Sequence, residues 1–181
     1  GDPHFTTWKK EHFDFQGECD LVLIDNTSFK DGTGMTVHGR TKLHGTWSSF
    51  SGAAVKIGDD VLEIHGSDPA ILNGKQFQVP DVEYGTEYAY PKSVGGYSLT
   101  VQLAGPHTRR HIIHFGNGEK MFINNFKDFV DFEVESPRAA EFAGSVGLLG
   151  SYNTGTKLAR DGKTVIDDAD EVVVVLADRR E

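Results

Sequence analysis

The spacing of glycine is the feature that most restricts the fold of this chain. Twenty-one glycines are spread over 181 residues instead of being collected in one segment. Glycine readily adopts the positive φ angles of tight turns, so glycines that recur about every ten residues are typical of short strands joined by turns. Hydrophobic residues make up 38% of the chain, which is enough to form a core. The pattern predicts an all-β protein, and the length suits a single domain over residues 1–181.

Strand-like runs of apolar and alternating residues lie between these glycines. The segments 58–60 and 116–118 have the composition of tight hairpin turns. A run over 126–134 alternates with one slip, which is typical of a β-bulge. We expect strands at residues 12–15, 20–24, 35–40, 53–57, 61–64, 97–103, 109–115, 120–123 and 126–134.

Only residues 137–143 have a helical pattern, with a proline near the start and Gly144 as a stop. Residues 81–96, which are rich in tyrosine and glycine, are expected to form a long loop. The valine run at 172–176 is expected to be a strand paired within a sheet, because an unpaired strand of this kind would aggregate. We therefore predict an antiparallel β-sandwich, two sheets packed face to face, with one short helix.

Charge and composition narrow the classes of partner. The formal charge is −9, from 27 acidic and 18 basic residues, which argues against binding to nucleic acid. It is most simply an ordinary solvated acidic surface. No apolar run reaches the roughly 20 residues of a membrane span, and the first residues do not form a signal peptide. Because the chain starts with glycine, we expect it to be cut from a longer protein.

Three stretches of the chain together resemble the von Willebrand factor type D domain family. The opening Gly-Asp-Pro-His-Phe at 1–5 is similar to the opening motif of that family. The segment 13–23, Phe-Asp-Phe-Gln-Gly-Glu-Cys-Asp-Leu-Val-Leu, is similar to its first hairpin, and 147–153, Gly-Leu-Leu-Gly-Ser-Tyr-Asn, is similar to its Gly-Leu-Cys-Gly signature. The order and separation of the three stretches fit the family and cover nearly the whole chain. The amino-acid sequences of segments 54–60 and 160–163 are more similar to type D modules of algal or other non-animal secreted proteins.

The resemblance implies a fold and a function. It implies an extracellular, secreted β-sandwich module that serves structure, cell adhesion or assembly, and that is not an enzyme. Its partners would be other proteins or further copies of itself. It also implies that the first hairpin packs on the late signature, with a core of Phe13, Phe15, Leu21, Leu23, Leu148 and Leu149.

The first departure from the family concerns a disulfide. In the family the cysteine of the first hairpin pairs with one in the late signature, but here that second position is Leu149, and Cys19 is the single cysteine. We expect Cys19 to be a buried thiol that packs as a small apolar side chain rather than a reactive one. Loss of the bridge removes about 2–4 kcal/mol of stabilisation, which packing of Leu149 partly returns.

The second departure concerns Ca²⁺. The resemblance implies oxygen ligands shortly after the opening motif and after the late signature, as a hard divalent cation requires. Lys9 takes the place of an expected Asp, while Asn153 and Asp161 remain as possible ligands. We therefore favour loss of the calcium site, with no cofactor, and a lysine ammonium in the place of the cation. A separate site built from Asp161, Asp167, Asp168 and Asp170 stays open, although such runs are more often solvated.

The opening motif also allows self-cleavage of the Asp2–Pro3 bond, which occurs in some family members. The Asp2 carboxyl can attack its own backbone carbonyl to give a cyclic anhydride, while the proline nitrogen takes a proton and leaves. His4 is placed to assist that proton transfer, and water or an amine would then open the anhydride. The alternative is that Pro3 merely starts the first strand, where its missing N–H is not needed.

Two other classes of function stay open. A carbohydrate-binding or small-ligand module would use the tyrosines of 84–97 and Trp47. A hydrolase would use paired carboxylates, but adjacent acids such as Asp59 and Asp60 face opposite ways on a strand. For the same reason His111 and His114, three residues apart, are not expected to form a metal pair and are assigned to the surface or the core edge.

Overall fold

The computed structural model describes residues 3–66, 69–78, 83–135, 137 and 139–166. Strands dominate, and the described strand pairings are antiparallel, which confirms the all-β, sandwich-like class. The contacts group the chain into two compact units, residues 1–50 with 139–181, and residues 51–138. The prediction of one domain over 1–181 is not tested by this grouping and stays a prediction.

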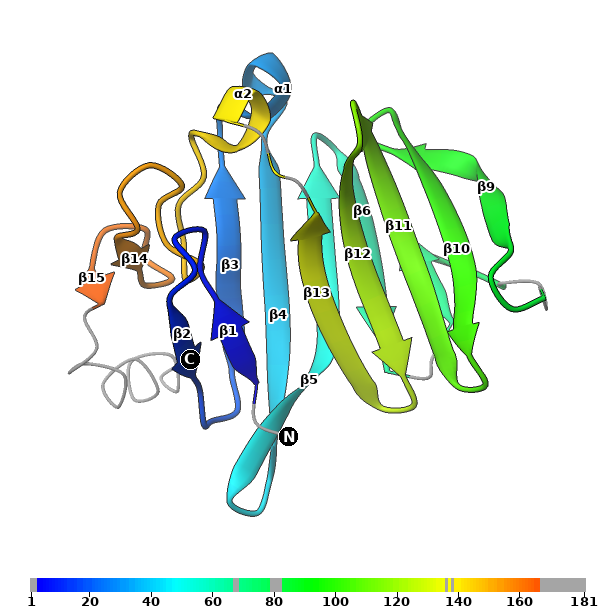
Figure 1. Ribbon diagram of the computed structural model, residues 1–181, viewed down its shortest axis with the longest axis horizontal. Helices are drawn as coiled ribbons and strands as arrows, with labels where there is room; N and C mark the ends of the chain where they lie inside the picture. The colour runs from blue at the N-terminus through cyan, green and yellow to red at the C-terminus, as the bar shows by residue number, and fades with distance from the viewer. Residues whose placement is uncertain (1–2, 67–68, 79–82, 136, 138, 167–181) are drawn as a thin grey trace. The chain divides into compact units, whose positions relative to one another are not determined.

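The first unit combines short and long antiparallel pairs (Figure 1). A two-stranded ladder at the start of the chain precedes a longer pair, and a second two-stranded ladder lies near residue 160. Its elements are β1 (His4–Thr6), β2 (His12–Asp14), β3 (Asp20–Asn26), α1 (Phe29–Gly32), β4 (Met35–His44), α2 (Ala139–Phe142), β14 (Lys157–Leu158) and β15 (Val165–Ile166), with the start of β5 (Trp47–Ile57).

The second unit contains the end of β5 and two sets of strands. One set follows β5 in chain order, and the other is a five-stranded sheet in the order β13-β12-β11-β10-β9 (Figure 1). The elements are β6 (Asp60–His65), β7 (Ala70–Leu72), β8 (Lys75–Phe77), β9 (Glu87–Val94), β10 (Tyr97–Gly105), β11 (Thr108–Gly116), β12 (Glu119–Phe126) and β13 (Phe129–Glu135).

Alternating burial explains why these strands stack in two layers. In β12 the side chains of Met121 and Ile123 are fully buried, whereas those of Lys120 and Phe122, which alternate with them along the strand, are half-buried. Such an alternation gives a sheet one apolar face. The strand β6, with Leu62 buried, contacts β9, β12 and β13 of the other sheet. The buried faces of the two sheets therefore form the core of the second unit.

The strand predictions are largely confirmed, and the exceptions have physical reasons. Both hairpin turns are confirmed, because Ile57 pairs with Asp60 and Gly116 pairs with Glu119. The long loop expected at 81–96 is wrong in part, since it contains β9. Pro91 suggested a loop. However, β9 is the edge strand of its described sheet, and its register with β10 shifts beside Pro91. Proline is tolerated both in edge strands and at such irregularities.

The strand expected over 126–134 is also wrong as a single element. β12 ends at Phe126, a turn follows, and β13 begins at Phe129. Lys127 takes a positive φ of 53° in that turn, so no glycine marked it. The short helix expected at 137–143 is confirmed as α2.

The sequence patterns missed several short elements, namely β1, β7, β8, β14 and β15. They also missed α1, in which Lys30 and Asp31 have positive φ angles of 49° and 53° and so do not continue a right-handed helix. The strand expected at 172–176 lies outside the described residues.

Candidate functional site

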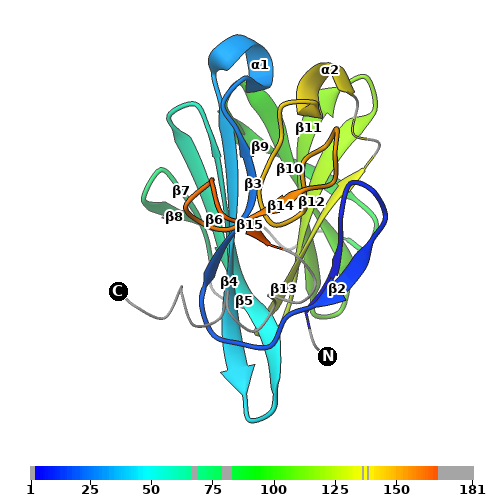
Figure 2. The same ribbon diagram turned by 90° about the vertical axis from the view of Figure 1, so that its left-hand side faces the viewer.

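The late signature docks on β3 in the first unit. The Leu148 and Leu149 amides donate to the Val22 and Leu23 carbonyls across 3.0 and 3.2 Å. Two residues before Leu148, Val146 exchanges two backbone hydrogen bonds of 2.8 and 2.9 Å with Asp25. The turn thus extends the edge of β3 with backbone bonds, and Figure 2 shows this segment running along β3.

Gly147 permits this close approach. It has a φ of +120°, and a side-chain Cβ at this position would lie 2.8 Å from the Leu23 carbonyl oxygen and 3.1 Å from that of Val22. Both atoms are backbone and have little freedom to move. Glycine is therefore required here by conformation and by space.

The loop between β1 and β2 closes on the same turn. The Trp8 amide donates to the Leu149 carbonyl across 3.1 Å. The Trp8 ring lies 5.6 Å from that of Phe142 and 5.5 Å from that of Tyr152, measured between ring centres. The expected packing of the opening hairpin region on the late signature is confirmed.

The expected core residues are mostly buried, with three corrections. Phe15, Leu21, Leu23 and Leu148 are at most 6% exposed. The expectation of full burial is wrong for three residues, since Phe13, Leu149 and Cys19 are only half-buried. Phe13 stacks flat on Phe5 at 4.7 Å, in a two-stranded ladder too small to cover both faces. The Cys19 amide donates to the Thr41 hydroxyl, and the Thr41 amide donates to the Cys19 carbonyl.

A buried lysine ammonium lies against an aromatic ring in the first unit. Lys157 is only 7% exposed, and its Nζ lies 4.8 Å from the centre of the Phe13 ring. A cation over an aromatic face is attracted by the ring quadrupole, more strongly where water is excluded. Lys157 therefore joins β14 to the β1–β2 ladder through both its charge and its buried stem.

Lys9 and Asp161, two of the residues singled out at the calcium site, make other contacts. The Lys9 side chain packs on Gly155, two residues after the exposed Asn153, with its Cγ 3.0 Å from the position of a Cβ at Gly155. The Asp161 carboxylate accepts hydrogen bonds from the Lys163 and Thr164 amides at 2.9 and 2.8 Å.

The bonds that Asp161 accepts also change its acidity. Hydrogen bonds from the Thr164 hydroxyl and amide, followed by that from Lys163, lower the pKa of Asp161 to about 2. The described part of the chain holds no group of three acidic, histidine or cysteine side chains arranged for a metal ion. Asp167, Asp168 and Asp170 lie outside the described residues.

The opening motif is visible from Pro3 onward, since Asp2 lies outside the described residues. Pro3 is buried, directly precedes β1, and accepts a hydrogen bond from the Phe15 amide at 3.4 Å. His4 is opposite Asp14 in the ladder, and its Nδ1 lies 2.6 Å from the Asp14 Oδ1. The sequence singled out His4 but gave no sign of Asp14, because their pairing depends on the register of two three-residue strands.

The two histidines of β11, His111 and His114, occupy different environments. His111 is 2% exposed, so its assignment to the surface or core edge is wrong, because its face of the strand packs inward. Burial, with a smaller contribution from the charge of Arg109, lowers the pKa of His111 to about 4. His114 is half-buried, with its Nε2 2.8 Å from the Thr100 hydroxyl and 3.7 Å from a Glu87 oxygen.

The paired carboxylate at Asp60 is structural. Its Oδ2 accepts from the Gly95 amide at 2.8 Å and its Oδ1 accepts from the Asn73 side chain at 2.9 Å. Both oxygens thus fasten turns within the second unit. Trp47, the aromatic residue singled out for ligand binding, belongs to the first unit, is half-buried and stacks on His44 at 4.4 Å.

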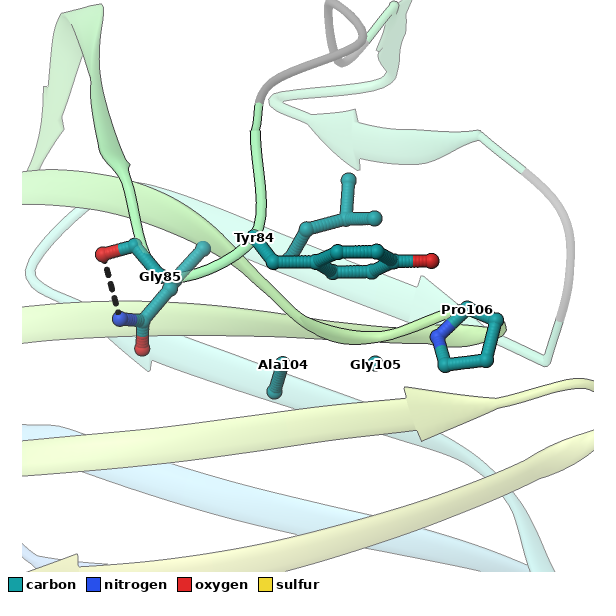
Figure 3. A pocket seen from close by; sticks show the side chains of 7 residues that line it. Tyr84, Gly85, Ala104, Gly105 and Pro106 are labelled. Atoms are coloured by element: carbon teal, nitrogen blue, oxygen red, sulfur yellow. Dashed lines mark hydrogen bonds between the residues drawn. The ribbon is translucent and has the colours of Figure 1, made fainter.

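The second unit carries a shallow groove beside Tyr84, a residue that is 64% exposed (Figure 3). The cavity volume is about 370 Å³. The Gly85 amide donates to the Leu103 carbonyl at 3.1 Å, and the Gln102 side chain donates to the Gly85 carbonyl at 3.0 Å. These two bonds fix the backbone that presents the tyrosine. The groove is lined by Tyr84, Gly85, Gln102, Leu103, Ala104, Gly105 and Pro106.

The fold and these sites define an antiparallel all-β protein with an aromatic groove in one unit and a docked late signature in the other. No protein-family model matches the chain, and no curated protein matches it. Among the described residues no helix is both long enough and apolar enough to span a bilayer.

Proposed function

We propose that this chain is a non-catalytic module of the von Willebrand factor type D kind, which serves adhesion or assembly in an extracellular protein. The observation that carries the proposal is the docking of residues 147–149 on β3 and on the loop after β1. Three motifs that are separate in the sequence are in contact, the first with the second through the Phe5–Phe13 pair and the second with the third through the hydrogen bond from the Leu148 amide to the Val22 carbonyl. If the three short motifs resembled the family only by chance, nothing would require them to be in contact in the structure.

The use of polar side chains around these contacts also supports a structural role. The Asn26 side chain, fully buried, donates to the Glu141 carbonyl at 3.0 Å and to the Ser145 hydroxyl at 3.1 Å. The buried Ser48 hydroxyl both accepts from the Gly17 amide at 2.8 Å and donates to its carbonyl at 2.9 Å. These groups satisfy backbone atoms and shape turns, which is what a rigid assembly module needs.

Self-association of the purified chain tests the assembly role. We expect the molar mass from light scattering to rise above that of a monomer as concentration increases, at one or more pH values between 5 and 8. Gly147→Ala, which displaces the docked turn, should weaken this association. Gly162 also has a positive φ, of +70°, but has nothing within 4 Å of a new Cβ, so Gly162→Ala should leave the association unchanged. A monomer mass at every concentration and pH, in calcium and in chelator, would contradict self-assembly.

Self-cleavage at the Asp2–Pro3 bond is a second candidate activity, and the His4–Asp14 pair favours it. A carboxylate bonded to one ring nitrogen orients an imidazole and leaves its other nitrogen for proton transfer. Mild acid incubation followed by intact-mass measurement tests this. Cleavage would remove the dipeptide Gly1-Asp2, while Asp2→Ala would stay intact and Asp14→Asn would cleave more slowly. An unchanged mass in the unaltered protein would rule the activity out.

A further inference from the structure

The groove beside Tyr84 has features of a ligand-binding site, and these features do not depend on the proposed assembly role. Its main feature is an aromatic ring held in solvent on a fixed backbone. Tyr84 precedes Gly85, whose amide and carbonyl are both hydrogen-bonded within the second unit. An exposed ring held in this way loses little freedom when a ligand covers it, so the apolar area it buries contributes to affinity.

We propose that this groove binds a neutral pyranose sugar, with the Tyr84 ring against the C–H face of the sugar. The face of an aromatic ring is electron-rich and attracts the weakly positive C–H groups of a pyranose. The Tyr84 side chain has an apolar ring and a polar hydroxyl at its tip. It therefore suits a pyranose, which is itself apolar on one face and polar at its edges.

The polar partner for the sugar hydroxyls is the Gln102 side chain. A carboxamide has two N–H donors and an acceptor oxygen, and only one donor is used in the hydrogen bond to the Gly85 carbonyl. The remaining donor and the oxygen match a hydroxyl group, which both donates and accepts. Gln102 also comes from β10, next to the groove floor, so its position is fixed by the sheet.

The lining also restricts the charge and size of the ligand. None of the groove residues carries a carboxylate, ammonium or guanidinium group, so a charged sugar acid would find no counter-ion there. Ala104 and Gly105 leave the floor low, at the point where the β10–β11 register shifts. The volume of about 370 Å³ lies at the small end of the roughly 300–1,000 Å³ of small-molecule sites, which suits one or two sugar rings.

The same groove is a poorer match for a proline-rich peptide. Grooves that bind such peptides are lined by several aromatic rings, each in contact with a turn of the extended ligand. Tyr84 is the single aromatic residue in this lining, and the other apolar side chains are those of Leu103, Ala104 and Pro106 (Figure 3). The sugar is therefore the favoured occupant.

Titration of the isotope-labelled full chain with the methyl glycosides of glucose, galactose and mannose tests the proposal by amide NMR. At least one glycoside should shift the Gly85, Ala104 and Gly105 amides, with a dissociation constant on the order of 1 mM. Tyr84→Ala should weaken binding about tenfold, while Tyr84→Phe, which keeps the ring, should retain it. Gln102→Leu should also weaken binding.

Tyr88→Ala is the matched control, because Tyr88 is another exposed tyrosine, 38% accessible, that does not line the groove. It should bind as the unaltered protein does. The proposal is overturned if no glycoside shifts these amides, if Tyr84→Ala binds equally well, or if a proline-rich peptide shifts them and the glycosides do not. None of these results bears on the light-scattering test of assembly.

Discussion

The Trp8 amide donates a hydrogen bond to the Leu149 carbonyl across 3.1 Å. This bond joins the loop after the first strand to a turn that comes late in the sequence of the first unit. On its other side the same turn is bonded to β3 through the Leu148 and Leu149 amides. The turn is thus held between two segments from the start of the chain. Its stability should depend on the residues that allow this close packing.

Gly147→Ala should be strongly destabilising. A Cβ at this position meets the Leu23 carbonyl oxygen at 2.8 Å and requires a side chain to adopt a φ of +120°. We expect a loss of about 3 kcal/mol in the free energy of unfolding, measured by urea denaturation. Gly162→Ala, with a φ of +70° and nothing within 4 Å, should lose only about 1 kcal/mol. Equal losses in both variants would show that the close approach at Gly147 contributes nothing.

Lys157→Ala should destabilise the first unit by about 2 kcal/mol, because it removes a buried stem and a cation over the Phe13 ring. Lys127 provides the control. Its Nζ also lies over a ring, at 5.3 Å from the centre of Phe126, but both residues are exposed. Lys127→Ala should change the free energy of unfolding by less than about 0.5 kcal/mol. If the two variants unfold alike, Lys157 has no special role.

His111 should make the second unit sensitive to acid. Its pKa is lowered from 6.5 to about 4 by burial, so the unfolded chain binds a proton that the folded chain does not between these pH values. The stabilisation is complete above pH 6.5 and is lost as pH falls towards 4, by about 3 kcal/mol in all. Denaturation at a series of pH values should show this slope.

Two variants check the assignment of that slope to His111. His111→Leu should flatten it, whereas His107→Leu, which replaces an exposed histidine, should keep it. A slope that persists in His111→Leu would assign the acid sensitivity to another group.

The sequence predicted the β class and most strands, because burial alternation and glycine turns are local signals. It predicted the docking of Leu148 and Leu149 on the first strands only through the resemblance, since no local pattern specifies which distant segments meet. It misread residues 81–96, where Pro91 suggested a loop. A proline is compatible with a strand at a sheet edge or bulge, and neither feature is visible before the sheet order is known.

The sequence was least informative about individual sites. The Tyr84 region was singled out, but its groove depends on Gln102, Gly105 and Pro106, which come from a neighbouring strand and turn. The partnership of His4 with Asp14 depends on strand register. Burial of His111 depends on which face of β11 packs inward. Each of these properties comes from tertiary structure rather than from residue type.

Calcium should not stabilise this chain. The Asp161 carboxylate is already used by the Lys163 and Thr164 amides, and Lys9 brings a positive charge next to the loop that holds Asn153. A ligand that binds weakly adds almost nothing to the free energy of unfolding, so the thermal midpoints in millimolar calcium and in chelator should agree within about 1 °C.

Lys9→Asp makes this prediction sharper. It replaces the ammonium with a carboxylate beside Gly155, two residues after Asn153, and so adds an oxygen ligand of the kind that calcium requires. We expect calcium to raise the thermal midpoint of this variant, and Lys10→Asp, which adds the same charge one residue later, to show no such response. Stabilisation of the unaltered protein by calcium would mean that Lys9 does not prevent binding. A lack of response in Lys9→Asp would mean that the loop has lost more than one ligand.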